Sequence, residues 1–281
     1  MKLKNYRKYF TEQLLPLYDT AEAERFFIIT LEELKGWNRS RLALNPDEEM
    51  TPDEVRQWDE VLQSLKGQKP IQYIFGKAWF YGLEFRVNEN TLIPRPETEE
   101  LVEWIISENI NRQDITILDI GTGSGCIAVS LAKNLSDAKV FALDVSEKAL
   151  EISRYNAQAN GANVTFIKED ILRVKELPQQ FDIIVSNPPY VRHLEKAEIK
   201  ENVLQYEPHL ALFVEDNDAL LFYRTIAQLG KSGLKQSGML YFEINQYLGN
   251  ETVNMLAESH YKDIILKKDM FGNDRMVKAQ L

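Results

Sequence analysis

The sequence has few of the residues that build disulfide frameworks and metal sites. Its 281 residues include one cysteine, Cys126, and three histidines, at positions 193, 209 and 260. A single cysteine excludes an internal disulfide and is typical of a protein in a reducing compartment, so we expect a cytoplasmic location. The histidines do not have the spacing of a metal-binding motif, and we therefore expect no metal cofactor.

Long hydrophobic runs are also absent. No apolar stretch approaches the roughly 18 residues that a membrane-spanning helix needs. The first residues, Met1 to Arg7, are basic, but they lead into an amphipathic pattern rather than into the apolar core of a signal peptide. We therefore expect neither a membrane partner nor an export signal.

Positive charge is scarce as well. The chain has 33 Lys and Arg against 43 Asp and Glu, which gives a net charge of −10 and a pI near 5.0. Non-specific binding to nucleic acids depends on positive surface that neutralises phosphates, so this balance argues against a direct nucleic-acid partner. It favours a protein or a small molecule instead, and a basic protein would be attracted most easily.

Residues 1–70 show helical periodicity and no strand pattern. Apolar residues recur at helical spacing from Leu3 to Leu17 and again from Ala21 to Lys35. A third helix is indicated by the capping sequence Thr51-Pro52-Asp53-Glu54 and by Gly67, at which it would end. With 11 Lys and Arg and 13 Asp and Glu over residues 1–74, this part is close to neutral. We interpret it as a small helical bundle that recognises a substrate; an accessory to folding is the alternative.

The pattern changes over residues 71–94. From Gln72 to Val87, aromatic and aliphatic residues surround Tyr81-Gly82, which predicts a β-hairpin. A turn then leads to Pro96, and the proline with the acidic residues after it is typical of a helix start. We interpret 71–94 as a hairpin linker between the helical domain and a second domain over 95–281.

Strand-like and helical segments alternate beyond residue 114. Such alternation is typical of a mainly parallel sheet with right-handed crossovers. The last two strands lie too close together for a crossover helix, so we expect them to form an antiparallel hairpin at one edge of the sheet. The seven predicted strands are Ile115–Ile120, Lys139–Leu143, Val164–Ile167, Phe181–Ser186, Gly238–Ile244, Asp263–Leu266 and Arg275–Ala279, and the predicted helices are Gly125–Asn134, Glu147–Asn160, Asp218–Leu229 and Leu248–Ser259.

A glycine-rich loop, Gly121-Thr122-Gly123-Ser124-Gly125, follows the first of these strands. Glycines let the backbone approach a ligand that sits at the N-terminus of the next helix. The dinucleotide-binding fingerprint requires a glycine where this chain has Cys126. Asp119, at the entrance of the loop, would repel a diphosphate and suits a ligand that carries positive charge, such as S-adenosylmethionine.

Acidic residues follow the next two strands. Asp144 stands where a carboxylate typically accepts hydrogen bonds from the ribose hydroxyls of an adenosine group, with helix capping as the alternative. Asp170 is placed to accept from an adenine amino group while Ile171 and Leu172 pack against the ring. For Asp170 a solvated turn is the alternative.

The fourth strand runs directly into Asn187-Pro188-Pro189-Tyr190, here called the elbow. The prolines fix φ and bias Asn187 away from a helical conformation, so its side-chain amide and the carbonyl of Pro188 are held at the carboxyl end of the strand. These two oxygens can accept both N–H groups of a planar NH₂, and Tyr190 offers an aromatic face beside them. The alternative is a proline-rich turn with no chemical role.

The order of these features resembles the class I S-adenosylmethionine-dependent methyltransferases, and the elbow resembles the members that methylate amide or exocyclic amino nitrogens. The resemblance implies a Rossmann-like α/β fold. By the resemblance, the glycine loop, Asp144 and Leu172 line the cofactor S-adenosylmethionine, which is converted to S-adenosylhomocysteine. Asp119, Asp170, Ile171 and Asn187 are further candidates for binding it.

The wider sequence resembles the release-factor glutamine methyltransferase family (HemK/PrmC). The motifs that carry this resemblance are spread over the chain: Gln68 to Gly76, Phe80 to Phe85, Leu92 to Glu99, Gly121 to Gly125, Asn187 to Tyr190, Tyr206 to Pro208 and Asp269 to Arg275. The family methylates the side-chain amide of the glutamine in the Gly-Gly-Gln motif of peptide-chain release factors. By this resemblance, release factors are the expected partner and the helical domain contacts them.

The resemblance also assigns roles to individual residues. Asn187, Pro188, Pro189 and Tyr190 would hold the glutamine, and Asn187, Pro188 and Tyr190 would assist the transfer. The segment with Arg95, Glu97 and Thr98 would border the active site. The alternatives are a nucleic-acid adenine N6-methyltransferase, which the net charge disfavours, a catalytically silent cofactor-binding scaffold, and an NAD-dependent oxidoreductase, which Cys126 and Asp119 disfavour.

Overall fold

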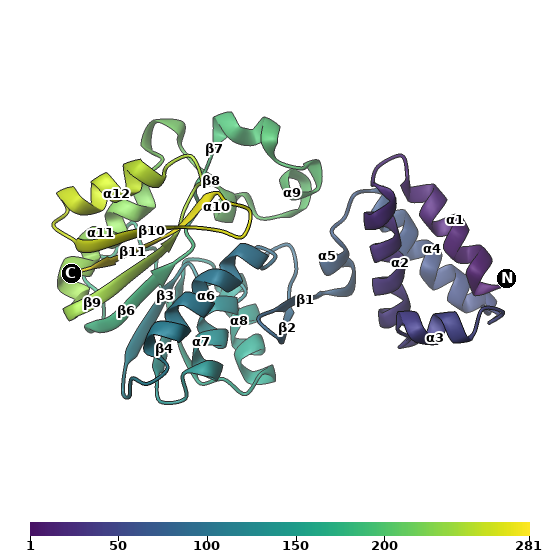
Figure 1. Ribbon diagram of the computed structural model, residues 1–281, viewed down its shortest axis with the longest axis horizontal. Coiled ribbons are helices and arrows are strands. Elements are labelled where there is room, and N and C mark those ends of the chain that lie inside the picture. The colour runs from purple at the N-terminus through teal and green to yellow at the C-terminus, as the bar shows by residue number, and fades with distance from the viewer. The chain divides into compact units, whose positions relative to one another are not determined.

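The computed structural model describes residues 1–281, which form two compact units. The first unit comprises Met1–Gly76 together with the short segment Glu201–Tyr206, and the second comprises Lys77–Lys200 and Glu207–Leu281. Figure 1 shows the first unit as a group of helices and the second as a sheet with helices on both of its faces.

The first unit is helical throughout, as predicted. Its core gathers side chains from the three longer helices around the buried Trp58, whose indole contacts the rings of Tyr6, Phe10 and Phe27. Thr51 and Glu54 form the expected capping box, which is worth about 1 kcal/mol. The helices are α1 (Leu3–Leu14), α2 (Thr20–Lys35), α3 (Arg39–Leu44), α4 (Pro52–Lys66), α5 (Ile71–Phe75) and α9 (Glu201–Tyr206).

The expected hairpin is shorter than its sequence pattern. Ile71–Phe75 is the helix α5 rather than a strand. Gly76 ends this helix in the left-handed conformation, and the first strand of the hairpin begins after it. The hairpin joins β1 (Lys77–Phe80) to β2 (Leu83–Arg86) through Tyr81-Gly82, both with positive φ, as a type I′ turn requires. The Tyr81 N–H donates to Glu99 at 2.8 Å, which stabilises this unusual conformation of a bulky residue.

The second unit contains the predicted seven-stranded sheet in the order β10-β11-β9-β6-β3-β4-β5. The pairs among β9, β6, β3, β4 and β5 are parallel, whereas β11 is antiparallel to both β9 and β10. The antiparallel edge hairpin is therefore confirmed. The strands are β3 (Thr116–Ile120), β4 (Lys139–Asp144), β5 (Val164–Lys168), β6 (Phe181–Ser186), β9 (Leu234–Glu243), β10 (Lys262–Lys268) and β11 (Asp274–Gln280).

Helices bury both faces of the sheet (Figure 1). One hydrophobic cluster packs α6 (Pro96–Asn109), α7 (Cys126–Asn134) and α8 (Glu147–Ala159) against one face. A second cluster packs α11 (Leu221–Gly233) and α12 (Gly249–Glu258) against the other. This two-sided burial explains why the central strands are nearly continuous apolar runs rather than alternating ones.

The order in which strands are added reverses at β3, because β4 and β5 lie on one side of it and β6 on the other. Ligands bind open α/β sheets at such a switch point, outside the carboxyl ends of the strands. After β6 the chain forms the short parallel pair β7 (Val191–Arg192) and β8 (Phe213–Val214), with 3₁₀ turns η1 (His193–Glu198) and η2 (Asp216–Asp218) and helix α10 (His209–Leu212).

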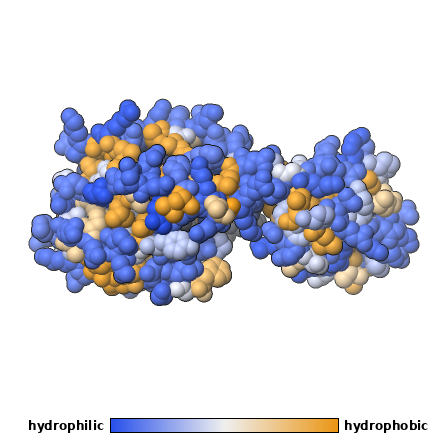
Figure 2. All heavy atoms as spheres, turned by 90° about the horizontal axis from the view of Figure 1, so that it is seen from above, coloured by the Kyte–Doolittle hydropathy of each residue, from blue (hydrophilic) through white to orange (hydrophobic).

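Hydrophilic residues dominate the face of the molecule drawn in Figure 2, and apolar residues form separate patches on it. None of the helices is both long and apolar enough to cross a membrane.

Candidate active site

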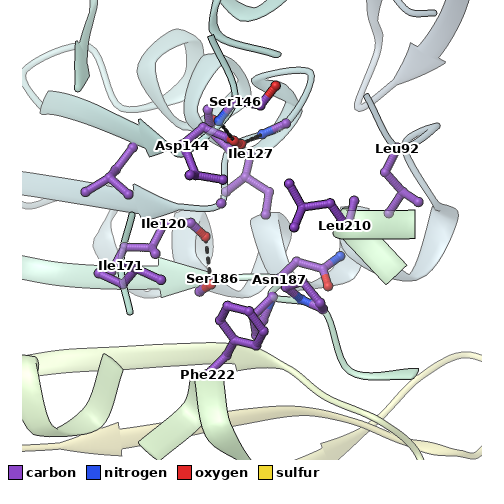
Figure 3. A pocket seen from close by; sticks show the side chains of 18 of the residues that line it. Leu92, Ile120, Ile127, Asp144, Ser146, Ile171, Ser186, Asn187, Leu210 and Phe222 are labelled. Carbon is purple, nitrogen blue, oxygen red and sulfur yellow. Dashed lines mark hydrogen bonds between the residues drawn. The ribbon is translucent and has the colours of Figure 1, made fainter. Parts of the chain in front are cut away.

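A pocket of about 280 Å³ lies at the switch point of the sheet. It brings together most of the residues that the sequence singled out, although they are spread over 95 positions (Arg95 to Pro189). The predicted residues that line it are Arg95, Thr98, Gly121, Thr122, Gly123, Ser124, Asp144, Asp170, Ile171, Leu172, Asn187, Pro188 and Pro189. Figure 3 shows Asp144 and Ser146 on one side of this pocket and Asn187 and Phe222 on the other.

The glycine loop forms one wall. Gly121, Gly123 and Gly125 all have positive φ, a conformation that side chains rarely adopt. Gly121 and Gly123 line the pocket. Gly125 does not line it, but a Cβ atom there would lie 2.8 Å from the Oγ of Ser153, so glycine also lets α7 approach α8 closely. The loop therefore depends on glycine for two separate reasons.

Asp144 ends β4 beside this loop. Its Oδ2 accepts from the Gly123 N–H and its Oδ1 from the Ser146 N–H, each at 2.9 Å (Figure 3). A carboxylate has about four lone-pair sites, so acceptor capacity remains for a ligand. Helix capping, the alternative for Asp144, is the task of Ser146, whose Oγ accepts from the Ala149 N–H at the start of α8.

The part of the pocket wall that follows β5 is apolar. Ile171 is buried, and Leu172 is partly exposed at the rim. Asp170 turns the chain there, since its Oδ1 accepts from the Leu172 N–H at 3.1 Å. These three residues thus place an aliphatic wall and one carboxylate at the carboxyl end of β5, where a flat ring can lie.

Asp119 lies beneath the glycine loop and does not line the pocket. Its Oδ2 accepts from the Thr122 hydroxyl at 2.6 Å. Burial raises the pKa of Asp119 to about 7, although this hydrogen bond acts in the opposite direction. Direct contact between Asp119 and a charged ligand stays a prediction; in this geometry the residue supports the loop from below.

The elbow places Asn187 in the pocket wall beside Leu210 and Phe222 (Figure 3). Its Nδ2 donates to the Thr98 hydroxyl over 3.4 Å. The segment that follows β9 fixes the chain after the elbow, because the buried Asn245 amide donates to the Tyr190 carbonyl at 2.9 Å. The Ser186 hydroxyl donates to the Ile120 carbonyl at 2.7 Å and ties the end of β6 to β3.

Tyr190 and Glu97 do not line this pocket. The Tyr190 ring packs against the hydrophobic cluster under α11, and its hydroxyl donates to Glu243 at 3.2 Å. Glu97 lies in the first turn of α6. Their contact with a substrate stays a prediction.

Two buried carboxylates complete the site and were not assigned a role from the sequence. Glu207 accepts from the Arg95 guanidinium at 2.5 Å and from the Ile93 N–H at 3.1 Å, so it holds the segment before α6 against the pocket. Glu243, at the end of β9, accepts from the Thr98 hydroxyl at 2.6 Å. Burial raises the pKa of Glu243, and the Thr98 hydrogen bond opposes that shift. A charged residue at the end of an apolar strand is the signal that could have found it.

No group of three or more His, Cys, Asp and Glu side chains has an arrangement that could hold a metal ion.

Two family models match parts of the chain. The model of the PrmC N-terminal domain matches residues 7–76, and that of the methyltransferase small domain matches residues 98–210. Among solved structures, a methyltransferase from Pyrococcus furiosus covers 80% of this chain and 98% of its own with a TM-score of 0.52. At 18% identity that likeness shows the fold alone.

Curated relatives match over nearly the whole length. A release factor glutamine methyltransferase from Flavobacterium psychrophilum is 59% identical over 99% of both chains. A protein with the same description from Bacteroides thetaiotaomicron is 44% identical over 96% of this chain and 97% of its own. Since the fold, the elbow and the full-length matches agree, the chain belongs to the release factor glutamine methyltransferase family.

Proposed function

We propose that this protein methylates the side-chain amide nitrogen of the glutamine in the Gly-Gly-Gln motif of peptide-chain release factors, with S-adenosylmethionine as the methyl donor. The observation that carries the proposal is the position of the elbow: Asn187 and Pro188 line the same pocket as the glycine loop and Asp144. The description shared by the two relatives named above supports the choice of substrate.

The hydrogen-bond acceptors and apolar side chains that line the pocket fit S-adenosylmethionine. Asp144 retains lone pairs for the ribose hydroxyls after binding the Gly123 and Ser146 N–H groups. Ile171 and Leu172 offer an apolar surface to the adenine ring, with the Asp170 carboxylate at its edge. The glycine loop leaves open space where side chains would project, at Gly121 and Gly123. Bound there, this cofactor supplies a methyl group on a positively charged sulfur.

The elbow addresses the weak nucleophilicity of an amide nitrogen, whose lone pair is delocalised into the carbonyl group. The Asn187 Oδ1 and the Pro188 carbonyl can each accept one N–H of the substrate amide, which orients the nitrogen and favours positive charge on it during transfer. S-adenosylmethionine held by the glycine loop and Asp144 would supply its methyl group to this nitrogen and be left as S-adenosylhomocysteine, and the amide would lose one proton. Positioning supplies much of the acceleration in such a displacement.

We assign the helical unit, centred on residues 1–70, to recognition of the release factor, and residues 71–94 to the connection with the methyltransferase domain over 95–281. A cytoplasmic location is part of the proposal, because the substrate acts in translation and the single cysteine suits a reducing compartment.

Replacing Asn187 by Ala tests the proposal. The substitution removes one of the two acceptors for the substrate amide, so we expect methyl transfer to fall at least about a hundredfold while S-adenosylmethionine still binds. Mass spectrometry of the Gly-Gly-Gln peptide from the treated release factor measures the first, and calorimetry the second. Wild-type transfer to DNA or RNA but not to the release factor would overturn the proposed substrate, and binding of NAD instead of S-adenosylmethionine would overturn the cofactor.

A further inference from the structure

Three side chains form a buried chain of hydrogen bonds behind the elbow. The Thr98 hydroxyl stands between the Asn187 amide, at 3.4 Å, and the Glu243 carboxylate, at 2.6 Å. Thr98 comes from the first turn of α6, Glu243 from the end of β9 and Asn187 from the elbow after β6. Thr98 is 2% exposed and Glu243 is 1% exposed, so bulk water does not compete for the hydrogen bond between them.

Which group donates in each of these hydrogen bonds follows from the single proton on the Thr98 hydroxyl. Glu243 accepts from the hydroxyls of both Thr98 and Tyr190, so the single hydroxyl proton of Thr98 goes to Glu243 over the short 2.6 Å contact. The Thr98 oxygen can then only accept from Asn187, which requires the Nδ2 side of the amide to face it. The opposite orientation would set Asn187 Oδ1 against an oxygen that has no proton left to donate.

We propose that Glu243, acting through Thr98, fixes the orientation of the Asn187 side-chain amide so that its oxygen faces the glutamine to be methylated. Glu243 and Thr98 are positioning residues in this scheme, and neither touches the reacting atoms. The inference rests on the proposed function, because the orientation matters only where the pocket must accept an N–H group from a substrate.

A second hydroxyl holds the carboxylate in place. Tyr190, the last residue of the elbow, donates to the other oxygen of Glu243 at 3.2 Å. Both ends of the elbow are therefore linked to one buried carboxylate, Asn187 through Thr98 and Tyr190 directly. This arrangement gives the tyrosine of the elbow a task that does not require it to line the pocket.

Two nearly isosteric substitutions break the direction of the chain in different ways. Thr98→Val removes the hydroxyl and leaves Asn187 free to rotate. Glu243→Gln adds an N–H group that can donate to the Thr98 oxygen, so the Thr98 proton can turn towards Asn187. The Asn187 side chain would then turn its Oδ1 towards Thr98 and away from the substrate. For each we expect kcat for release-factor methylation to fall about tenfold or more, with little change in the KM for the release factor or in the affinity for S-adenosylmethionine. Thr98→Ser keeps the hydroxyl and should recover most of the loss.

Matched controls separate orientation from simple loss of a buried hydrogen bond. Thr252→Val removes an equally buried hydroxyl, which donates to the Leu248 carbonyl at 2.7 Å in α12. Glu108→Gln changes a half-exposed carboxylate that accepts from the Tyr241 hydroxyl at 2.6 Å and from the Lys278 ammonium at 2.7 Å, outside the pocket lining. We expect both controls to change the melting temperature and to leave kcat unchanged.

The measurements are steady-state kinetics of the full-length variants on unmethylated release factor, calorimetry with S-adenosylmethionine, and thermal unfolding. An unchanged kcat in Thr98→Val or Glu243→Gln overturns the inference, as does a Thr98→Ser variant that is as slow as Thr98→Val. A wild-type protein that transfers no methyl group to release factor overturns the proposed function instead, and the inference with it, so the two failures are distinguishable.

Discussion

Asp119 illustrates how strongly burial changes one residue. Its side chain lies under the glycine loop, and burial raises its pKa from 3.8 to about 7. The folded state therefore binds this proton more tightly than the unfolded state does. It follows that the free energy of unfolding declines as pH rises from about 4 to about 7, by at most roughly 1.4 kcal/mol per pH unit from this group.

Replacement of Asp119 by Asn should remove that dependence, because the amide is neutral and can still accept from the Thr122 hydroxyl. We expect the variant to gain stability relative to wild type between pH 5 and pH 7, with a constant difference above the folded-state pKa. Urea unfolding of both proteins across this range measures the effect. A stability difference that is flat with pH, or that moves the other way, would contradict the assignment.

The site residues that belong to short motifs could be located from the sequence, whereas those that only the fold brings together could not. The glycine loop and Asn187 each follow a recognisable strand, and the strand order then brings them to one edge of the sheet. Glu243 carries no such local pattern. Its partner Thr98 lies 145 positions away, so only the packing of α6 against β9 reveals the contact. The inward turn of Asp119, away from the pocket, likewise depends on the packing beneath the loop.

The buried side-chain amide of Asn156 joins three structural elements. Asn156 in α8 accepts from the Arg86 N–H at 2.7 Å and donates to the carbonyls of Arg86 and Ser124. It thereby connects the end of the β1–β2 hairpin, the glycine loop and α8. Since Asn156 is only 1% exposed, water cannot replace these bonds if the amide is removed.

We expect Asn156→Leu, which has a similar shape, to lower the free energy of unfolding by about 1–3 kcal/mol and to weaken binding of S-adenosylmethionine. The second effect follows because the glycine loop would lose its anchor at Ser124. The control is Asn134→Leu, whose amide donates only to the Ser130 carbonyl one turn earlier in α7. Equal loss of cofactor affinity in both variants would show that the Asn156 contacts have no special role.

Most elements were predictable because their apolar periodicity agrees with their final burial. The short elements α3, α9, α10, β7 and β8 were not predicted, and α5 was assigned to the wrong class, because Tyr73 and Phe75 read as strand residues. Five residues are too few for a helical period to show, and aromatic residues favour strands when packing does not intervene. Here Pro70 precedes the helix, Gly76 ends it, and Ile71 is buried in the core of the helical unit.

At the scale of the whole molecule, the hydrophobic residues form separate cores. One cluster contains only residues of the helical unit, and the other two lie on the faces of the sheet. Units with their own cores can unfold in separate steps, in which case a single melting temperature does not describe the protein. The proposed cofactor site lies entirely within the sheet unit.

Calorimetric unfolding should therefore resolve two transitions. S-adenosylmethionine should raise the midpoint temperature of only one of them, because a ligand stabilises the unit that binds it. Leu62 and Leu240 are both fully buried, the first in the helical core and the second beneath α11 and α12. Replacing either residue by Ala should lower the free energy of unfolding of its own unit by about 2–5 kcal/mol. We expect Leu62→Ala to lower the ligand-independent transition alone and Leu240→Ala to lower the ligand-dependent one. A single transition that both variants and the ligand shift together would mean that the two units unfold as one cooperative body.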